Sequence, residues 1–316
     1  MAEVLVVSER PGSVVLSRVS PESSAVVAEV PLEGGFDLTT HPSLPLAYLT
    51  SGADGGTVVT VDLVTGAAHR LPGVGGWPCH LAVSPGGGAL ASANYDGGSV
   101  SLIELRDGVA YGPVRTTTLP APAGGPGTDP ERQDRSRPHT VRFADGGLLV
   151  TDLGTDWVLR LDEDLRLVGT AVVCPAGSGP RHLVADASGG LWVSLELSNQ
   201  VGRVVGDDVI VGPATTAAYE GRSYAGDIAA AGAWVVMANR GADTVSVYDS
   251  REPGVVLVQE VATSGRWPAS LAVVGDTVAV ANRDSGSVAF FPVTEAGLGE
   301  PVVVGCDRPI ALASAG

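Results

Sequence analysis

The chain has 316 residues and a formal net charge of −16 at pH 7, because 35 Asp and Glu residues outnumber 19 basic residues that are all Arg. This acidity argues against nucleic-acid and anionic membrane partners, and the absence of Lys excludes Schiff-base chemistry and a P-loop lysine. The 43 Gly and 22 Pro residues supply many turns, as a single soluble domain built from short strands requires.

Targeting and membrane-spanning segments are not predicted. The chain begins with a short apolar run in MAEVLVVSERPG that has Glu on both sides and no cleavage-site pattern, and no long apolar stretch follows. We therefore expect a cytoplasmic protein, either a monomer or a weak homo-oligomer. Cys79, Cys174 and Cys306 are widely spaced and form no C-x-x-C pair, which predicts buried thiols rather than a disulfide framework or a zinc site.

A unit of several short strands recurs about every 43 residues. Each unit alternates apolar and polar residues and is broken by Gly-Gly, Asp-Gly or Ser-Asn turns, which is typical of antiparallel strands. A polar residue closes the second strand of each unit, in chain order Glu9, Ser51, Asn94, Asp152, Glu196, Asn239 and Asn282. The steps between these residues are 42, 43, 58, 44, 43 and 43. Such a period is typical of a four-stranded propeller blade.

The first unit lacks its inner strand. Its segment VLVVSERPGSVVLSRV matches VAVANRDSGSVAFFPV, and the missing strand is found at the C-terminus in Ile310–Ala313. Joining the two ends completes a seventh blade and leaves no open sheet edge in the ring. The sequence therefore predicts an all-β fold with one domain over residues 1–316. This domain is a seven-bladed β-propeller of four-stranded blades, closed by N- and C-terminal strands in one shared blade.

One step is 58 residues long instead of 43, so about 15 residues are extra. They lie in APAGGPGTDPERQDRSRPHT and predict an insertion loop at about residues 120–137. Long insertions in a regular repeat are usually surface loops, and binding residues are often found on them. This loop leads directly to His139, although a disordered loop without a function is the alternative.

Propeller geometry predicts which side chains meet. The inner strand of each blade lines the channel and the second strand runs antiparallel to it, so residues that begin inner strands share a face with residues that end second strands. Basic residues gather at these positions. They are His80, His139, Arg181, His182, Arg10, Arg240 and Arg283. Because Arg binds carboxylate or phosphate through two parallel hydrogen bonds, the basic rim predicts a small anionic ligand.

Three segments resemble matching blades of the seven-bladed lactonase family. They are PHTVRFADGGLLVTDLGTDWVLRL, GSGPRHLVADASGGLWVSLELSNQV and MANRGADTVSVYD. That family includes 6-phosphogluconolactonases of one type and fungal carboxymuconate-lactonising cycloisomerases, and the similarity extends over essentially the whole ring. The resemblance implies a catalytic cluster of His139, Arg181, Glu196 and Arg240. Two departures bear on the substrate: Asp227 stands where relatives often carry His, and Pro268-Ala269-Ser270 where they often have Pro-Arg.

The resemblance also implies roles for these residues. Arg181 and Arg240 would hold the anionic group and the carbonyl oxygen of the substrate. Either His139 or Glu196 would activate water, and which of the two is the base stays open. This chemistry needs no metal or other cofactor. Further substrate contacts are expected from side chains on the same rim, although His80 and His182 could equally face the core. These are His182, His80, Asn94, Arg283 and Arg10.

Three functions fit this reading of the sequence. The first is hydrolysis of a small anionic lactone of the sugar-acid type, for which 6-phosphogluconolactone is the best-known substrate in the family. The second is lactone formation by a cycloisomerase of the muconate type, and the third is binding of a ligand or protein without turnover. A weaker alternative for the site is Ca²⁺ bound by the ring of closing residues, since their oxygens surround one axis. Trp77 and Trp267 are expected to pack between blades.

Overall fold

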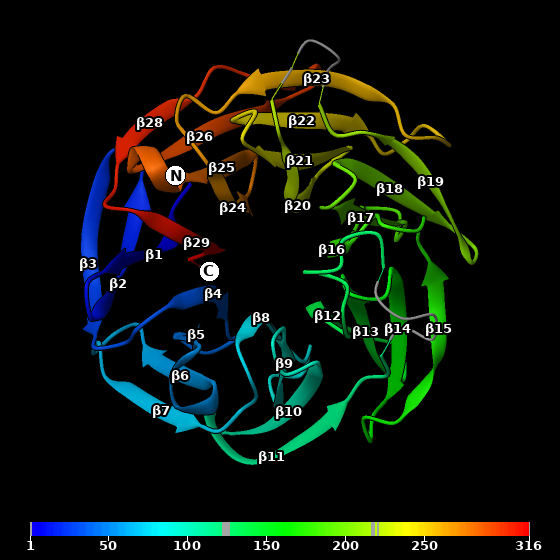
Figure 1. Ribbon diagram of the computed structural model, residues 1–316. Helices are drawn as coiled ribbons and strands as arrows, with labels where there is room; N and C mark the ends of the chain where they lie inside the picture. The colour runs from blue at the N-terminus through cyan, green and yellow to red at the C-terminus, as the bar shows by residue number, and fades with distance from the viewer. Residues whose placement is uncertain (1, 122–126, 216–218, 220, 316) are drawn as a thin grey trace.

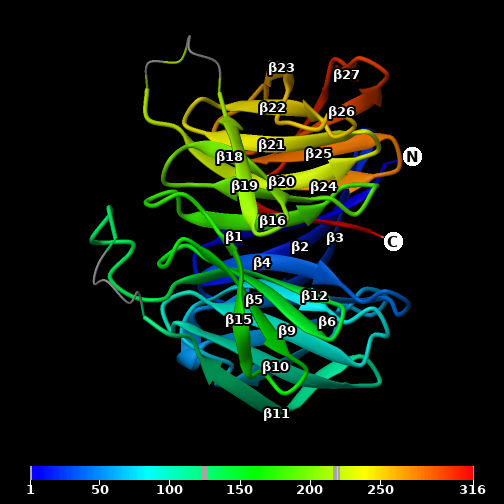
Figure 2. The same cartoon turned by 90° about the vertical axis from the view of Figure 1, so that its right-hand side faces the viewer.

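Seven antiparallel β-sheets surround one central channel in the computed structural model, which describes residues 2–121, 127–215, 219 and 221–315 (Figure 1). Within these residues no helix is long and apolar enough to cross a membrane. Both ends of the chain lie at one face of the ring, and the segments that follow β11 and β19 extend from the other face (Figure 2).

The first three blades follow one another along the chain. Blade 1 contains β4 (Gly35–Thr40), β5 (Leu46–Ser51), β6 (Thr57–Asp62) and β7 (Ala68–Pro72). Blade 2 contains β8 (Pro78–Val83), β9 (Ala89–Asn94), β10 (Ser99–Arg106) and β11 (Val109–Thr118). Blade 3 contains β12 (Pro138–Ala144), β13 (Gly147–Asp152), β14 (Trp157–Asp162) and β15 (Leu167–Val173).

The next three blades repeat this order. Blade 4 contains β16 (Pro180–Ala185), β17 (Leu191–Leu195), β18 (Gln200–Val205) and β19 (Asp208–Pro213). Blade 5 contains β20 (Tyr224–Ala231), β21 (Trp234–Arg240), β22 (Thr244–Asp249) and β23 (Leu257–Ala262). Blade 6 contains β24 (Pro268–Val274), β25 (Thr277–Asn282) and β26 (Ser287–Thr294), and its outer edge is divided between β27 (Gly297–Leu298) and β28 (Val302–Gly305).

Blade 7 closes the ring with strands from both ends of the chain. Its order is β29 (Pro309–Ser314), β1 (Val4–Arg10), β2 (Ser13–Ser20) and β3 (Ser23–Val30). Two short 3₁₀ helices, η1 (Ala53–Gly55) and η2 (Arg283–Ser285), complete the described elements. The predicted all-β seven-bladed propeller with one shared closing blade is therefore confirmed, with the divided outer edge of blade 6 as the one departure from four strands.

A separate hydrophobic cluster fills each of the seven interfaces between neighbouring blades. The middle strands are apolar on both sides, as in β5, where all six residues are buried, whereas β3 begins with four exposed residues. Since no blade can bury both faces alone, the blades stabilise one another by stacking. Leu312 of β29 lies in the cluster shared with blade 6, and Ala311 lies in the cluster shared with blade 1.

Candidate active site

A cavity of about 290 Å³ opens at the mouth of the channel, on the face where the inner strands begin. Residues from five consecutive blades, 4 to 7 and 1, line it. They are Arg181, Arg240, Arg283, Arg308, Glu9, Gly35, Phe36, Trp267, Ala269 and Ile310. Four arginines therefore face one small cavity in a protein of net charge −16, and their combined field favours an anionic ligand.

A bulge near the start of each inner strand positions the channel residues. Bulges change the direction of side chains and leave one N–H outside the ladder. In three blades a hydroxyl of the second strand accepts a hydrogen bond from that N–H, as Ser194 does from His182 at 3.1 Å.

The bulged residues form an upper layer nearest the cavity, which consists of Phe36, Cys79, His139, Arg181, Gly226, Ala269 and Ile310. The residues that follow form a lower layer, which consists of Asp37, His80, Thr140, His182, Asp227, Ser270 and Ala311.

Side chains of the lower layer also join neighbouring blades. The N–H of Leu81 donates to Asp37 at 2.7 Å, and the N–H of Leu271 donates to Asp227 at 2.8 Å. Two further blade pairs are joined in the same way through His80 and Ser270, which accept the N–H groups of Val141 and Leu312.

The strand register corrects the sequence-based alignment at two blades. In five blades the predicted closing residue pairs with the start of the inner strand, but Leu195 takes this place in blade 4 and Ser8 takes it in blade 7. Glu196 and Glu9 therefore lie one residue further on, at the position that Arg240 occupies in blade 5. Because successive side chains in a strand point to opposite sides, this shift directs Glu196 toward the channel instead of into its own blade.

Glu196 lies at the centre of a cluster of arginines. Its Oε2 is 2.8 Å from Arg181 Nη1 and 3.1 Å from Arg240 Nη2, and its Oε1 is 3.1 Å from Arg132 Nη2. Arg181 Nη1 also donates to His139 Nε2 at 2.7 Å. The structure thus brings together His139, Arg181, Glu196 and Arg240, the four residues that the resemblance implies. Arg181 and Arg240 line the cavity, whereas His139 and Glu196 lie behind them.

The charges in this cluster determine its protonation states. Burial alone would raise the pKa of Glu196, but the charges of Arg240, Arg181 and Arg132 outweigh it and hold that pKa well below its ordinary value. Burial and the Arg181 charge lower the pKa of His139 far below its ordinary value. Burial and the Arg181 charge also lower the pKa of Arg240 to about 10. At neutral pH the site therefore holds a carboxylate, a neutral imidazole and protonated arginines.

His139 is more buried than its predicted position on an exposed rim implied, with only 6% of its surface exposed. Because its Nε2 accepts from Arg181, its Nδ1 carries the ring proton. A strongly depressed pKa and an occupied Nε2 make His139 a poor general base. Glu196, which three arginines hold as an anion, is equally unsuited to that role. Both residues instead fix the positions of the arginines.

Arg132 is a member of the site that the sequence did not single out. It lies in the predicted insertion, of which residues 122–126 are outside the described residues. Its Nε donates to the Tyr95 hydroxyl at 2.7 Å. The neighbouring Gln133 is fully buried and donates to the Leu153 carbonyl and to Asp156, which holds this part of the loop against blade 3. The segment ERQDRSR contains arginines close to the rim, but nothing in the sequence indicates which of them contacts Glu196.

The five predicted substrate contacts are found in different places. Arg283 lines the cavity and pairs with Asp284, whereas His80 and His182 lie in the lower layer of the channel. Arg10 lies outside the cavity, where it pairs with Asp307 at 3.3 Å and remains 43% exposed. The prediction that Arg10 contacts a ligand in the cavity is therefore not supported by its position.

Asn94 is fully buried and cannot reach a ligand in the cavity, so its predicted contact is wrong. Its amide donates to the hydroxyls of Ser99 and Ser101 within blade 2. Three further closing residues are equally buried: Asp152 accepts from Ser136 and two backbone N–H groups, Asn239 donates to two hydroxyls and Asn282 donates to the Thr263 carbonyl. Because these four residues are buried while Glu196 and Glu9 pair with arginines, the closing residues are not placed together as one ring of calcium ligands.

Both predicted tryptophans lie between neighbouring blades. Trp267 precedes blade 6, and its ring centre is 5.9 Å from the guanidinium of Arg240 in blade 5 and 5.1 Å from that of Arg283. Trp77 precedes blade 2, is 43% exposed, and its ring centre is 4.2 Å from that of Phe36 in blade 1. Trp267 and Phe36 also line the cavity. Phe36 and Trp267 therefore give the arginine-rich cavity an apolar side.

Several buried donors at the site have no hydrogen-bond acceptor among the described residues. They are His139 Nδ1, Arg181 Nε and Arg240 Nε. A buried donor without an acceptor is costly, so the cluster is suited to receive oxygen atoms. Gly226 contributes to this arrangement, because a Cβ at this position would lie 3.2 Å from Arg240 Nε.

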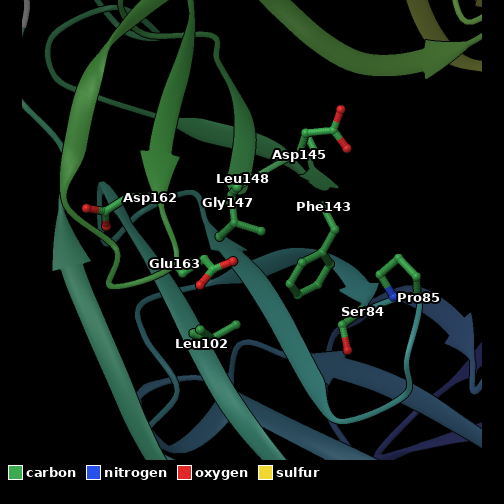
Figure 3. A pocket seen from close by; sticks show the side chains of 11 residues that line it. Ser84, Pro85, Leu102, Phe143, Asp145, Gly147, Leu148, Asp162 and Glu163 are labelled. Atoms are coloured by element: carbon green, nitrogen blue, oxygen red, sulfur yellow. The ribbon is translucent and has the colours of Figure 1, made fainter.

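A second cavity, of about 400 Å³, lies between blades 2 and 3 on the opposite face. Figure 3 shows that loops of both blades line it, with Phe143, Leu102 and Leu148 near the acidic Asp145 and Glu163. It contains none of the predicted site residues. In the described part of the chain, no group of three or more His, Cys, Asp or Glu side chains is placed to hold a metal ion.

Comparisons with known proteins agree with this architecture. A family model described as "Lactonase, 7-bladed beta-propeller" matches residues 39–301. The 6-phosphogluconolactonase of Bacillus subtilis (strain 168) is 26% identical over 235 residues, which cover 68% of this chain and 65% of that protein, slightly less than two thirds of its length.

Two solved structures are similar over nearly the whole chain. The periplasmic gluconolactonase of Pseudomonas aeruginosa superimposes with a TM-score of 0.81 at 23% identity and covers 98% of both chains. A protein from Lactobacillus plantarum gives a TM-score of 0.81 at 21% identity, again over 98% of both chains. At these identities the two likenesses show the shared fold.

Proposed function

The chain belongs to the seven-bladed β-propeller lactonase family, and from this premise we propose that it hydrolyses a small anionic lactone of the sugar-acid type in the cavity at the channel mouth. One observation carries the proposal. Arg181 and Arg240 line the cavity and keep buried N–H donors without acceptors. Such fixed donors stabilise the negative charge that develops on a carbonyl oxygen under attack.

The balance of charge supports an anionic substrate. Arg132, Arg181 and Arg240 share one carboxylate, that of Glu196, so this cluster of four side chains carries more positive than negative charge. The outer arginines are each compensated, since Arg283 pairs with Asp284 at 2.8 Å and Arg308 pairs with Glu9 at 2.7 Å. The excess charge therefore lies beside Arg181 and Arg240, where it would attract an anion.

The reaction proposed here is addition of water to the lactone carbonyl. The water oxygen bonds to the carbonyl carbon, the carbonyl oxygen becomes an oxyanion, and the Arg181 and Arg240 N–H groups stabilise it. The ring C–O bond then breaks, and the departing oxygen takes up the proton that the added water gives up, which gives the open-chain hydroxy acid. His139 and Glu196 keep the arginines in place during both steps, because they accept hydrogen bonds or ion pairs from them.

Acid release from a panel of lactones tests this proposal. The purified protein is mixed with 6-phosphogluconolactone, with its non-phosphorylated counterpart gluconolactone and with a neutral aliphatic lactone, and buffer-only hydrolysis is subtracted. We expect the fastest release from the phosphorylated compound, and we expect the rate to survive EDTA because no step requires an ion. Acid release at the buffer rate for every lactone would refute the proposal. Loss of a conjugated diene absorbance without acid would indicate a cycloisomerase instead.

Arg181→Lys is expected to lower kcat by about 10²-fold and to raise KM, because Lys keeps the charge but loses the planar pair of donors. Steady-state kinetics on the best lactone of the panel measures both constants. Arg10→Lys is the matched control, since Arg10 lies on the same face outside the cavity. An Arg181→Lys enzyme as active as the Arg10→Lys enzyme would contradict the role given to Arg181.

A further inference from the structure

A histidine and an aspartate face each other in the lower layer of the channel. His182 Nδ1 lies 2.7 Å from Asp227 Oδ1, and the two side chains are only 16% and 14% exposed. His182 directly follows Arg181 on the innermost strand of blade 4, so the exposed part of its ring faces the channel below the cavity. Its ring centre is 5.2 Å from that of His139.

Asp227 is held as an anion that can accept the His182 proton. Burial alone would raise its pKa, but His182 and the Leu271 N–H outweigh that effect and hold the pKa at about 2. The Leu271 N–H binds Oδ2 at 2.8 Å and leaves Oδ1 directed at the imidazole. A carboxylate that accepts from Nδ1 fixes the ring orientation and leaves the lone pair on Nε2. Among the described residues, the polar contact found for the His182 ring is the one from Nδ1 to Asp227.

We propose that His182 is the general base of the reaction and that Asp227 positions it. This inference rests on the lactonase function proposed above. A water molecule between His182 Nε2 and the substrate carbonyl loses a proton to Nε2 as its oxygen bonds to the carbonyl carbon. The same proton passes to the ring oxygen when the ring C–O bond breaks, so atoms and charges balance and no further reactant is needed. Asp227 stabilises the imidazolium that exists between the two steps.

Other titratable or charged groups surround His182, and a test must distinguish their titration from that of His182. They are Asp227 from β20, His80 from β8, His139 from β12, Arg181 from β16 and Asp37 from β4. Asp37 holds the same place in blade 1 as Asp227 holds in blade 5, and burial raises its pKa to about 7. A fall in activity below neutral pH could therefore arise from Asp37, which makes Asp37→Asn the matched control.

The experiment compares kcat against pH for the wild type, His182→Gln, Asp227→Asn and Asp37→Asn. For His182→Gln we expect kcat to fall by about 10²–10⁴-fold, the range for a general base, with KM changed less than threefold. Its residual rate should rise in proportion to hydroxide. For Asp227→Asn we expect a smaller fall in kcat. The acid limb of its kcat–pH profile should move to lower pH, since a neutral amide no longer stabilises the imidazolium. Asp37→Asn should keep kcat within about threefold of the wild type and leave the acid limb at the same pH.

The outcomes separate the two proposals. A wild-type protein that opens no lactone refutes the function and the base together. Two results would overturn the His182 assignment while leaving the function intact. In the first, the wild type is active and His182→Gln keeps a kcat within threefold of it. In the second, only Asp37→Asn loses the acid limb of the kcat–pH profile. If a variant fails to fold, the contact between His182 and Asp227 can be checked in the wild type by a measurement that does not depend on turnover. At a pH where His182 is neutral, nitrogen NMR of the five histidines should place its ring proton on Nδ1. A neutral ring with its proton on Nε2 would overturn the inference.

Discussion

Removing residues 309–316 is expected to lower the melting temperature by at least about 10 °C. The truncation deletes β29, which pairs with β1 and packs on β24 and β4. It removes Leu312 and Ala311 from two inter-blade clusters and leaves β1 with an open edge at the channel. Loss of several buried apolar side chains costs several kcal/mol, and each kcal/mol lowers the melting temperature of a large domain by about 2–4 °C.

A circular permutant provides the control for this truncation. The N–H of Ala315 donates to the Glu3 carbonyl at 3.3 Å, so a short Gly-rich linker can join the two ends. New ends in the exposed turn at Gly206 and Asp207, between β18 and β19, leave every strand present. This permutant should melt within a few degrees of the native chain in differential scanning calorimetry. A truncated protein that melts as high as the permutant would show that β29 is not needed to close the ring.

Glu196→Gln is expected to reduce both stability and turnover. The amide keeps the shape of the side chain, but it leaves Arg132, Arg181 and Arg240 without their shared carboxylate. Removing one partner of a buried ion pair costs about 3–5 kcal/mol. Repulsion should also displace Arg181 and Arg240, and a shift of about 1 Å in such groups costs about 10²-fold in rate. Denaturant unfolding and lactone kinetics on the same preparation measure the two effects.

Asp152→Asn is the matched control for the loss of a buried carboxylate. Asp152 is fully buried but accepts from neutral donors only: its Oδ1 accepts two backbone N–H groups, and its Oδ2 accepts the Ser136 hydroxyl. An amide can keep the first two bonds and donate to Ser136, so this variant should lose no more than about 1 kcal/mol. Equal losses in Asp152→Asn and Glu196→Gln would mean that the arginines do not depend on Glu196.

The effect of Glu196 on stability should disappear in acid. Its folded pKa is held below its ordinary value, so the unfolded chain binds the proton more readily than the native state does. The stabilisation is complete above about pH 5, since the unfolded Glu has a pKa of about 4.3, and it is lost as the pH falls through the folded value. The unfolding free energies of the wild type and Glu196→Gln should therefore approach each other as the pH falls below the unfolded pKa, and they should meet only below the folded pKa of Glu196.

The sequence was sufficient to predict the blades, their number and their closure, because strand alternation and a constant step are local properties of the chain. The sequence was a less reliable guide at the site, where a shift of one residue in strand register changes the direction in which a side chain points. Glu196 was aligned with Asn94, yet the strand register places it one residue further on, where it reaches three arginines. His139 proved buried for a different reason, because it lies among Arg181, Tyr95 and His182 from neighbouring blades.

The contacts that the insertion and the lower layer make with distant segments could not be predicted. Arg132 reaches Glu196 across 64 residues of sequence, and the path of its loop depends on a buried Gln133 that no pattern distinguishes. The pairing of His182 with Asp227 requires two blades to stack in one register. The sequence showed that Asp227 departs from its relatives, but only the structure supplies the histidine that it contacts.

The two layers of channel residues differ in how freely they can change over evolution. Four lower-layer side chains, of Asp, His or Ser, join two blades by accepting a backbone N–H of the neighbouring blade. A mutation at one of these four positions is tolerated only if another acceptor replaces the side chain. The upper layer carries residues as different as Arg181, Gly226 and Ile310, because no blade depends on them for that bond. New substrates should therefore arise through mutations in the upper layer, while the lower layer preserves the ring.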